Sequence, residues 1–490
     1  MGNKQSKAFL ISKRANNGNS VQDGNSRVAS KRTAEDMCGS SSNRDEELET
    51  EHSPGRKRLR TTSEYIYNVL FLEGENSDVT ISALGHEWKL HKVYLCQSGY
   101  FRGMLKGQWL ESSLSFIAIE IPDETVDRKA LDIAFGSLYS DEVDVNILRS
   151  HVIPTLAAAR LLDLTGLLVV CQDVMMETLS ASTVCRYHQA ACTYALTEVE
   201  RKCFQWIERN LLLCRTPAVA KEISQDVLEQ VLQSMEFVVM QVEVDVYNFL
   251  KIWVYLKLHP TCDLPLKSIV QETQRFFIER EQEENKRAFL ATEEGLQFAS
   301  TFKCLKLERL LEDSKAINLL KKDGIIPKEW LLSLYEEQWN RMLNVYNGSD
   351  QGPIEVPRDV FEKFACRCGR ILEKNSRYCW RWTGFSCGID IIVTYDNRNR
   401  SLSIKRNTYS QPCNSAICMQ SQRAVALRFK LFTTNDSGAE VNCKDTGLLH
   451  MMLKTDEEAP LFQLNENWTF PVFVSARIMI ASHDVNGQKV

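Results

Sequence analysis

Two groups of side chains in this sequence have residue types that bind metals or carry out catalysis. The stretch HEWKLH contains His86 and His91 five positions apart, whereas the helical zinc motif places its two histidines four apart. Two residues that are five positions apart face different directions on a helix and opposite faces on a strand, so the two imidazoles would not converge. We therefore expect no shared metal here and interpret His91 as a structural residue where a strand gives way to a helix.

The second group lies near the C-terminus and consists of Cys366, Cys368, Cys379 and Cys387. The paired spacings that are usual in zinc sites are absent, so we interpret these cysteines as core thiols rather than as ligands. The sequence also has no phosphate-binding loop, nucleophile elbow, dinucleotide fingerprint or kinase signature. It therefore predicts no metal, no cofactor and no enzyme. An unrecognised site in the last domain is the alternative.

Length and composition limit the class of protein. A chain of 490 residues corresponds to about three domains, at roughly 100 to 200 residues per domain. The net charge of -5 argues against bulk binding of nucleic acid. Sixteen cysteines without an apolar N-terminal signal fit a reduced cytosolic or nuclear compartment. No apolar run of about 18 residues exists, so we expect no membrane-spanning helix.

Residues 1–60 are rich in Asn, Ser, Gly and charge, and we expect them to be disordered. The start MGNKQSK places Gly2 in the pattern read by the myristoyl transferase. One acyl chain binds membranes weakly, and the nearby basic residues Lys4, Lys7, Lys13 and Arg14 would strengthen the attachment. The sequence thus predicts an acylated N-terminus that contacts a membrane, with a merely solvated basic arm as the alternative.

A dense basic run ends this tail and consists of Arg56, Lys57, Arg58 and Arg60. Such clusters are typical of nuclear import signals. No aromatic residue interleaves the run to stack on bases, so direct binding of nucleic acid is the weaker interpretation. The third interpretation is that the run is a group of solvated charges without a binding role.

Residues 61–147 have the pattern of a compact mixed α/β domain. Thr61 and Glu64 form a capping box ahead of a helix that carries Tyr65, Ile66, Val69 and Leu70 on one face. Alternation on either side of Gly85 predicts a hairpin over 79–90. A helical stretch over 91–105, interrupted at Ser98-Gly99, then precedes a strand at 117–121 and a helix at 130–138.

The rest of the chain divides into two further regions. Apolar residues three or four apart predict helices almost throughout 148–346. Segments such as GIDIIVTY, SLSIKR and VALRFKLF predict a β-rich domain over 357–490. The predicted fold class is therefore α+β and multidomain: a disordered tail, a mixed α/β domain, an all-α helical region and a β-rich C-terminal domain.

Particular stretches of the sequence resemble known families. SDVTI, LHKVYLCQSGYFRGML and IEIPDETVDRKALDIAFGSLYSDEV resemble the BTB domain. LAAARLLDLTGLLVVC and STVCRYHQAACTYALTEVERKCFQWIERNL are similar to the BACK helices that follow BTB domains in ubiquitin-ligase adaptors. The glycine doublets and period of Kelch repeats are absent. With KRLR before the BTB-like part and YCWRWTGFSCGIDIIVTYDN after the helices, the whole chain resembles the germ cell-less family.

This resemblance implies two protein-binding surfaces. BTB adaptors dock on a cullin through the helix pair around the Ser-Gly break and through a hydrophobic-x-Glu motif after it. In this sequence the cullin-binding residues would be Tyr100, Phe101, Met104, Trp109, Leu110 and Glu111. Packing of Trp109 over the domain's own core is the alternative. The first helix is the usual dimer seam, which would use Tyr65, Ile66, Val69 and Leu70.

The function implied by the resemblance is that of a dimeric, non-catalytic adaptor of a BTB-type cullin-RING ubiquitin ligase. It would act in germ-cell development, including spermatogenesis, and bind a protein substrate through the C-terminal domain. The expected location is the nucleus, at the nuclear envelope or matrix, with an acyl-anchored plasma-membrane pool as the alternative. The rival function is a nuclear-envelope structural protein, or one that binds transcription regulators, whose BTB domain serves only assembly.

Overall fold

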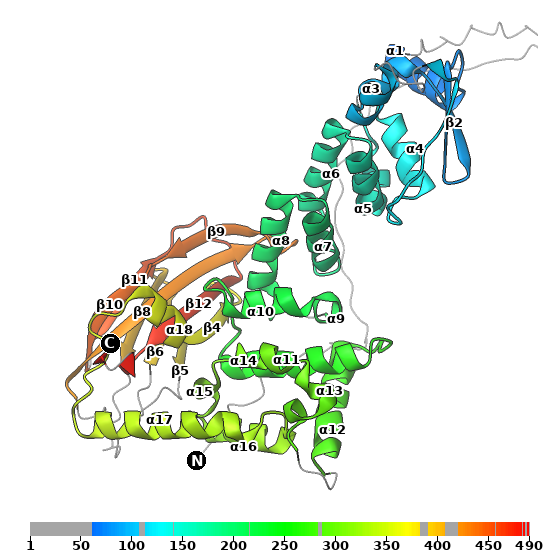
Figure 1. The fold of residues 1–490 in the computed structure, drawn as a ribbon. Coiled ribbons are helices and arrows are strands. Elements are labelled where there is room, and N and C mark those ends of the chain that lie inside the picture. The colour runs from blue at the N-terminus through cyan, green and yellow to red at the C-terminus, as the bar shows by residue number, and fades with distance from the viewer. Residues whose placement is uncertain are drawn as a thin grey trace, which may run out of the picture. The chain divides into compact units, whose positions relative to one another are not determined.

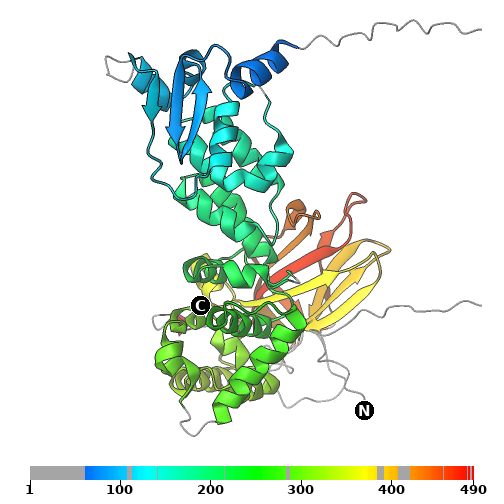
Figure 2. The same cartoon turned by 90° about the vertical axis from the view of Figure 1, so that its right-hand side faces the viewer.

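The computed structural model describes residues 61–106, 113–140, 142–214, 216–282, 287–382, 391–406, 420–455, 457–482, 484–485 and 488–489. Four predicted features lie outside these residues: the disordered tail, the acylation site Gly2, the basic run at 56–60 and the Trp109-Leu110-Glu111 motif. All the elements below belong to the unit of residues 60–490 (Figures 1 and 2). None of the described helices combines the length and the apolar character needed to cross a membrane.

The mixed α/β domain begins with the predicted capping box. The Glu64 N–H donates to Thr61 Oγ1 (3.1 Å), and the Thr61 N–H donates to Glu64 Oε2 (3.0 Å). This start is confirmed: α1 (Thr62–Tyr65) follows at once and continues as a π-helix, η1 (Ile66–Leu72). The reciprocal bonds satisfy two backbone donors that a helix N-terminus otherwise leaves open.

The predicted hairpin is also confirmed. Strands β1 (Val79–Ala83) and β2 (His86–Leu90) pair antiparallel across a two-residue turn at Leu84 and Gly85, both of which have positive φ. Strand β3 (Phe116–Ala118) pairs parallel with β1, which gives the order β2-β1-β3. It is shorter than the predicted strand at 117–121, because the chain leaves the sheet after a last bond from Ile119 N–H to Ser82 O (2.8 Å).

The stretch from His91 to Leu105 is two helices rather than one interrupted helix. These are α2 (Lys92–Leu95) and α3 (Gly99–Leu105), and Ser98 caps the second by accepting the Phe101 N–H (3.2 Å). Helix α4 (Arg128–Gly136) then covers the sheet, with Asp127 as its cap. The Ser-Gly pair thus ends one helix and starts another.

The middle of the chain is helical, as predicted. The helices are α5 (Val145–Leu161), α6 (Thr165–Glu177), α7 (Val184–Thr193), α8 (Thr197–Asn210), α9 (Ala218–Glu222), α10 (Gln225–Gln233), α11 (Glu243–Leu258), α12 (Leu266–Gln282), η3 (Phe289–Ala291), α13 (Glu293–Leu296), α14 (Ala299–Lys303), α15 (Leu307–Leu310), α16 (Ser314–Asp323) and α17 (Lys328–Tyr346). One apolar cluster runs from Val79 in β1 to Leu331 in α17. The mixed domain and the helices therefore share a continuous core.

The C-terminal part is β-rich, as predicted, and its described residues form two large antiparallel sheets and a two-stranded one. After α18 (Arg358–Phe364) come β4 (Cys366–Leu372), β5 (Tyr378–Trp382), β6 (Ile391–Asp396), β7 (Ser401–Arg406), β8 (Gln422–Thr434), β9 (Glu440–Asp445), β10 (Leu449–Lys454), β11 (Glu458–Gln463), β12 (Val472–Met479), β13 (Asp484–Val485) and β14 (Gln488–Lys489). One large sheet has the order β10-β8-β12-β4 with β9 also on β8, the other has the order β11-β7-β6-β5, and the two-stranded sheet is β13-β14.

The two large sheets share one apolar core and so form a sandwich. Val393 of β6 and Leu427 of β8 have no exposed surface and belong to the same cluster. Trp382 of β5 approaches Phe429 of β8, with ring centroids 6.1 Å apart. The sequence predicted strands here but not their arrangement.

Buried polar contacts join the helices to the sandwich. The Arg367 guanidinium in β4 donates to both carboxylate oxygens of Glu243 at the start of α11, and its Nη1 donates to Leu232 O (2.7 Å). Both charged side chains are almost fully buried. Burial alone would raise the pKa of Glu243, but the charge of Arg367 and its hydrogen bonds hold it below its usual value.

Other contacts between the same two regions reinforce this pair, which we call the Arg367–Glu243 clamp. The Trp206 Nε1–H of α8 donates to Ser437 O (2.6 Å). The Gly369 N–H of β4 donates to Gln241 O (3.0 Å), and a Cβ at Gly369 would lie 1.7 Å from Val239 O. Only glycine allows this close approach of the two backbones.

Candidate functional site

His91 occupies the predicted corner between β2 and α2. Its Nε2 lies 2.9 Å from Glu75 O, and because a carbonyl can only accept, Nε2 carries the proton. The Tyr139 hydroxyl accepts the His91 backbone N–H (2.8 Å) and lies 3.1 Å from Nδ1, to which it donates when the ring is neutral. Burial raises the pKa of Tyr139, which keeps this hydroxyl protonated. The predicted structural role is confirmed.

The break at Ser98-Gly99 is explained by contacts within the chain. Ser98 Oγ donates to Leu162 O (2.5 Å), and a Cβ at Gly99 would lie 1.8 Å from Asp163 Oδ2. Asp163 has a positive φ and lies in the turn between α5 and α6. The small residues let α3 approach that turn, so the break is a packing feature of the fold.

The predicted cullin-binding residues on α3 do not share one environment. Tyr100 and Met104 are partly exposed, one turn apart, whereas Phe101 has no exposed surface. Phe101 packs in the core against Phe135, with ring centroids 6.2 Å apart. The expectation that Phe101 contacts a partner is therefore wrong, because its ring is enclosed by its own domain.

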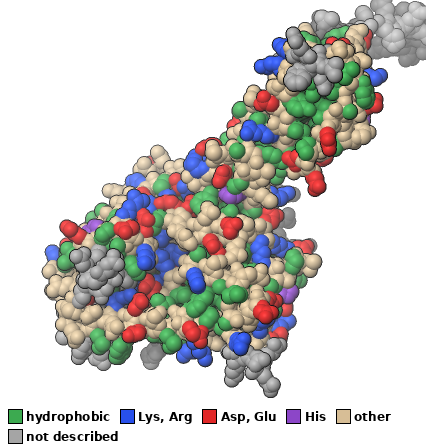
Figure 3. Space-filling model, in the orientation of Figure 1, with side chains coloured by type: hydrophobic (Ala, Val, Ile, Leu, Met, Phe, Trp, Pro, Cys, Tyr) green, Lys and Arg blue, Asp and Glu red, His purple; other side chains and the backbone are tan. Residues whose placement is uncertain are grey.

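The predicted dimer seam also combines inward and outward side chains. Tyr65 is 47% exposed, and Ile66 and Leu70 are partly buried. Val69 is only 6% exposed and belongs to the domain's own core, so its assignment to the seam is corrected. Sequence reasoning missed Leu72, which ends η1 and is 62% exposed. Figure 3 shows hydrophobic side chains gathered on one face of this domain.

The C-terminal cysteines are only partly core thiols. Cys366 and Cys368 are buried neighbours on one face of β4, with their Sγ atoms 3.7 Å apart, as expected for core residues. Cys379 is exposed, so the same expectation is wrong for it. Cys387 lies outside the described residues.

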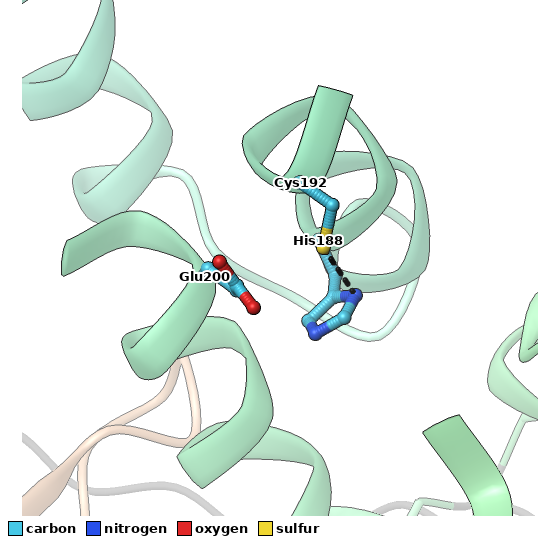
Figure 4. A group of neighbouring side chains, drawn as sticks. All are labelled: His188, Cys192 and Glu200. Carbon is cyan, nitrogen blue, oxygen red and sulfur yellow. Dashed lines mark hydrogen bonds between the residues drawn. The ribbon is translucent and has the colours of Figure 1, made fainter. Parts of the chain in front are cut away.

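Another group of residues has side chains of the types that bind metal ions. Within the described part of the chain, His188 and Cys192 of α7 and Glu200 of α8 bring one ligand atom each to within 4.8 Å of one another. Figure 4 shows the three side chains directed toward a shared space. Sequence reasoning missed this group. The i, i+4 spacing of His188 and Cys192 was a readable signal, but Glu200 joins them only across the turn.

Further apolar side chains are exposed on the helical region and the sandwich. Helix α17 carries a stripe of them, at helical spacing, that comprises Leu332, Tyr335, Trp339, Met342 and Leu343. On the sandwich, Val441 of β9 and Leu449 and Met452 of β10 are exposed. Apolar side chains that are exposed together on one helix face or edge strand are candidates for protein binding.

Comparison with known proteins places these features in a family context. A family model described as the BTB/POZ domain matches residues 67–179, which run from η1 to just beyond the end of α6. The match thus includes the hairpin, the His91 corner and α3.

Several curated proteins are similar over most of this chain. Germ cell-less protein-like 1 of Homo sapiens is 42% identical over 439 residues, which cover 89% of this chain and 84% of the relative. Germ cell-less protein-like 2 of Homo sapiens is 41% identical, with 88% and 81% covered. Protein germ cell-less of Drosophila melanogaster is 33% identical, with 87% and 78% covered. The likeness therefore extends through the helices and the sandwich.

Proposed function

The chain belongs to the germ cell-less family of BTB proteins, and on that premise we propose that it is a substrate-recruiting adaptor of a cullin-RING ubiquitin ligase. It acts as a dimer and catalyses no reaction itself. Its BTB domain binds the cullin, the helical region is the spacer, and the sandwich selects a protein substrate. We further propose that it acts in germ cells, at the nucleus or the nuclear envelope, and membership of the germ cell-less family supports this part of the proposal.

The observation that carries this proposal is the apolar surface left open on the BTB domain. Tyr65, Leu72 and Phe116 each expose about half of their surface or more. Phe116 lies on β3, an edge strand of the sheet. Burying such side chains against a second copy contributes about 1.5–3 kcal/mol each. Tyr100 and Met104 on α3 remain available for the cullin.

Substrate binding is assigned to the C-terminal part because apolar side chains are exposed there too. Strand β10 is an edge strand, so its backbone groups can also pair with an extended segment of a partner. Leu449 and Met452 lie on this strand. A protein substrate is therefore the ligand class that fits the sandwich.

The dimer is tested by changing the exposed residues of the first helix. We expect Tyr65→Asp with Leu72→Asp to raise the dimer dissociation constant at least 100-fold, because two large contacts worth about 3 kcal/mol together are lost. Light scattering on the protein as it elutes from a size-exclusion column measures the mass of the monomer or dimer. Leu84→Asp is the matched control, since Leu84 is 47% exposed but lies in the hairpin turn. A monomeric unsubstituted chain would contradict the dimer.

The nuclear location is tested separately. Changing Arg56, Lys57, Arg58 and Arg60 together to Ala should move the protein from the nucleus to the cytoplasm, because import receptors read clustered cations. Fluorescence microscopy of the tagged full chain measures this. Nuclear retention of the fourfold variant would rule out the basic run as the main import signal.

The acylation site is tested by Gly2→Ala, which leaves these charges intact. It should turn a nuclear rim into a diffuse nuclear signal, because it removes the acyl acceptor.

A further inference from the structure

The group formed by His188, Cys192 and Glu200 lies outside every surface assigned above. His188 and Cys192 are one turn apart on α7, so their side chains leave the same face of that helix. Glu200 lies in the first turn of α8. The turn between the helices includes Ala195, whose φ is positive. This tight connection fixes Glu200 opposite the other two.

The geometry of the pair on α7 already approaches that of a metal site. His188 Nδ1 and Cys192 Sγ are 3.7 Å apart. In a tetrahedral zinc site, Zn–S and Zn–N bonds of about 2.3 and 2.0–2.1 Å separate these atoms by about 3.6 Å. A Glu200 carboxylate oxygen lies within 4.8 Å of Cys192 Sγ and of a His188 ring nitrogen. A glutamate side chain can close the remaining distance by rotation about its single bonds.

The surroundings leave these ligands available. Arg201, the residue after Glu200, pairs instead with Glu198 (2.6 Å). Among the described residues, Glu200 forms no ion pair with a lysine or an arginine, so its charge is not neutralised.

The helix pair that carries the ligands is held rigidly by its core. Tyr187 and Ala191 of α7 and Val199 and Cys203 of α8 are buried in the main apolar cluster. A site on such a scaffold needs little reorganisation to bind an ion.

We propose that His188 Nδ1, Cys192 Sγ and a Glu200 carboxylate oxygen bind one Zn²⁺ ion, with water in the fourth position. Nitrogen, sulfur and oxygen ligands in a tetrahedral set are typical of zinc rather than of magnesium or calcium. Burial and the Glu200 charge raise the pKa of Cys192, so the free thiol is protonated. As the Zn–S bond forms, the Sγ proton passes to solvent. The ion links α7 to α8 and stabilises the helical region.

The test uses the purified full chain, stripped of metal and titrated with Co²⁺ as a spectroscopic probe and with Zn²⁺ by calorimetry. We expect one equivalent of Co²⁺ to give the near-ultraviolet absorption of a cobalt–thiolate bond. Cys192→Ser should abolish this absorption. His188→Gln and Glu200→Gln should each weaken Zn²⁺ binding at least tenfold, since even outer residues of zinc sites change affinity by about 10–100-fold.

The matched control is Cys443→Ser, because Cys443 is an exposed thiol on β9 and should leave binding unchanged. At one Zn²⁺ concentration the melting temperature of the unsubstituted chain should rise more than that of Glu200→Gln, and circular dichroism establishes that each variant is folded. The proposal is overturned if the unsubstituted chain shows no thiolate band, or if the band survives in folded Cys192→Ser.

Discussion

Replacing Arg367 by Ala is expected to lower the free energy of unfolding by about 3–5 kcal/mol, because it leaves Glu243 buried without its positive partner. Lys306 offsets only part of this loss, because its backbone N–H donates to Glu243 (2.9 Å) while its ammonium group bonds to Ala365 O (2.5 Å). The midpoint of urea unfolding, followed by circular dichroism, measures the change.

Two further variants decide whether burial of the charge is the cause. Arg358→Ala removes an exposed arginine that pairs with Glu362 (2.7 Å), and it should cost no more than about 1 kcal/mol. Arg367→Met combined with Glu243→Met replaces both charges by apolar groups of similar length and should recover much of the loss. Equal midpoints for Arg367→Ala and Arg358→Ala would show that the Arg367–Glu243 clamp contributes little to stability.

Trp109→Ala combined with Glu111→Ala is expected to weaken cullin binding at least tenfold while the dimer persists. Truncating an aromatic anchor of an interface costs about 2 kcal/mol or more, which corresponds to well over tenfold in affinity. The two residues follow α3, where Tyr100 and Met104 are partly exposed. Calorimetry with the N-terminal region of a BTB-binding cullin measures the affinity.

A matched pair elsewhere on the chain controls for nonspecific loss of surface. Trp339 and Glu336 are exposed on α17, and their combined change to Ala should leave cullin affinity unaltered. Unchanged affinity for the Trp109 variant would remove the docking motif from the proposal. Failure of the unsubstituted dimer to bind any BTB-binding cullin would favour the rival function, in which the BTB domain serves only assembly.

Local signals in the sequence predicted most of the elements but not their contacts. The capping box at Thr61 and Glu64 and the turn at Gly85 depend on neighbours within a few residues, so the sequence was sufficient for both. The partner of Gly99 is Asp163, which lies 64 positions further along the chain, and no local pattern identifies it. The sequence therefore revealed a helix break without its cause.

The same distinction explains the errors at the candidate surfaces. Helical spacing places Phe101 and Val69 among apolar residues, but it does not say which side of a wide apolar face turns inward. The pair of Arg367 and Glu243 is separated by 124 positions and involves charges, which sequence reasoning assigns to the surface. In each case, contacts between segments that are distant in the sequence determine which side chains are buried.

The Arg367–Glu243 clamp has a consequence for experiments that cut the chain. Because buried charges and backbone contacts cross from the helices to the sandwich, the two regions should melt as one cooperative unit. A fragment that stops before β4 would lack Arg367 and would expose to solvent the face of the helices that the sandwich covers, so it should fold poorly. If such a fragment failed to bind substrate, the cause could then be misfolding rather than removal of the substrate-binding surface. Single substitutions at exposed positions such as Met452 are the appropriate way to locate recognition on the sandwich.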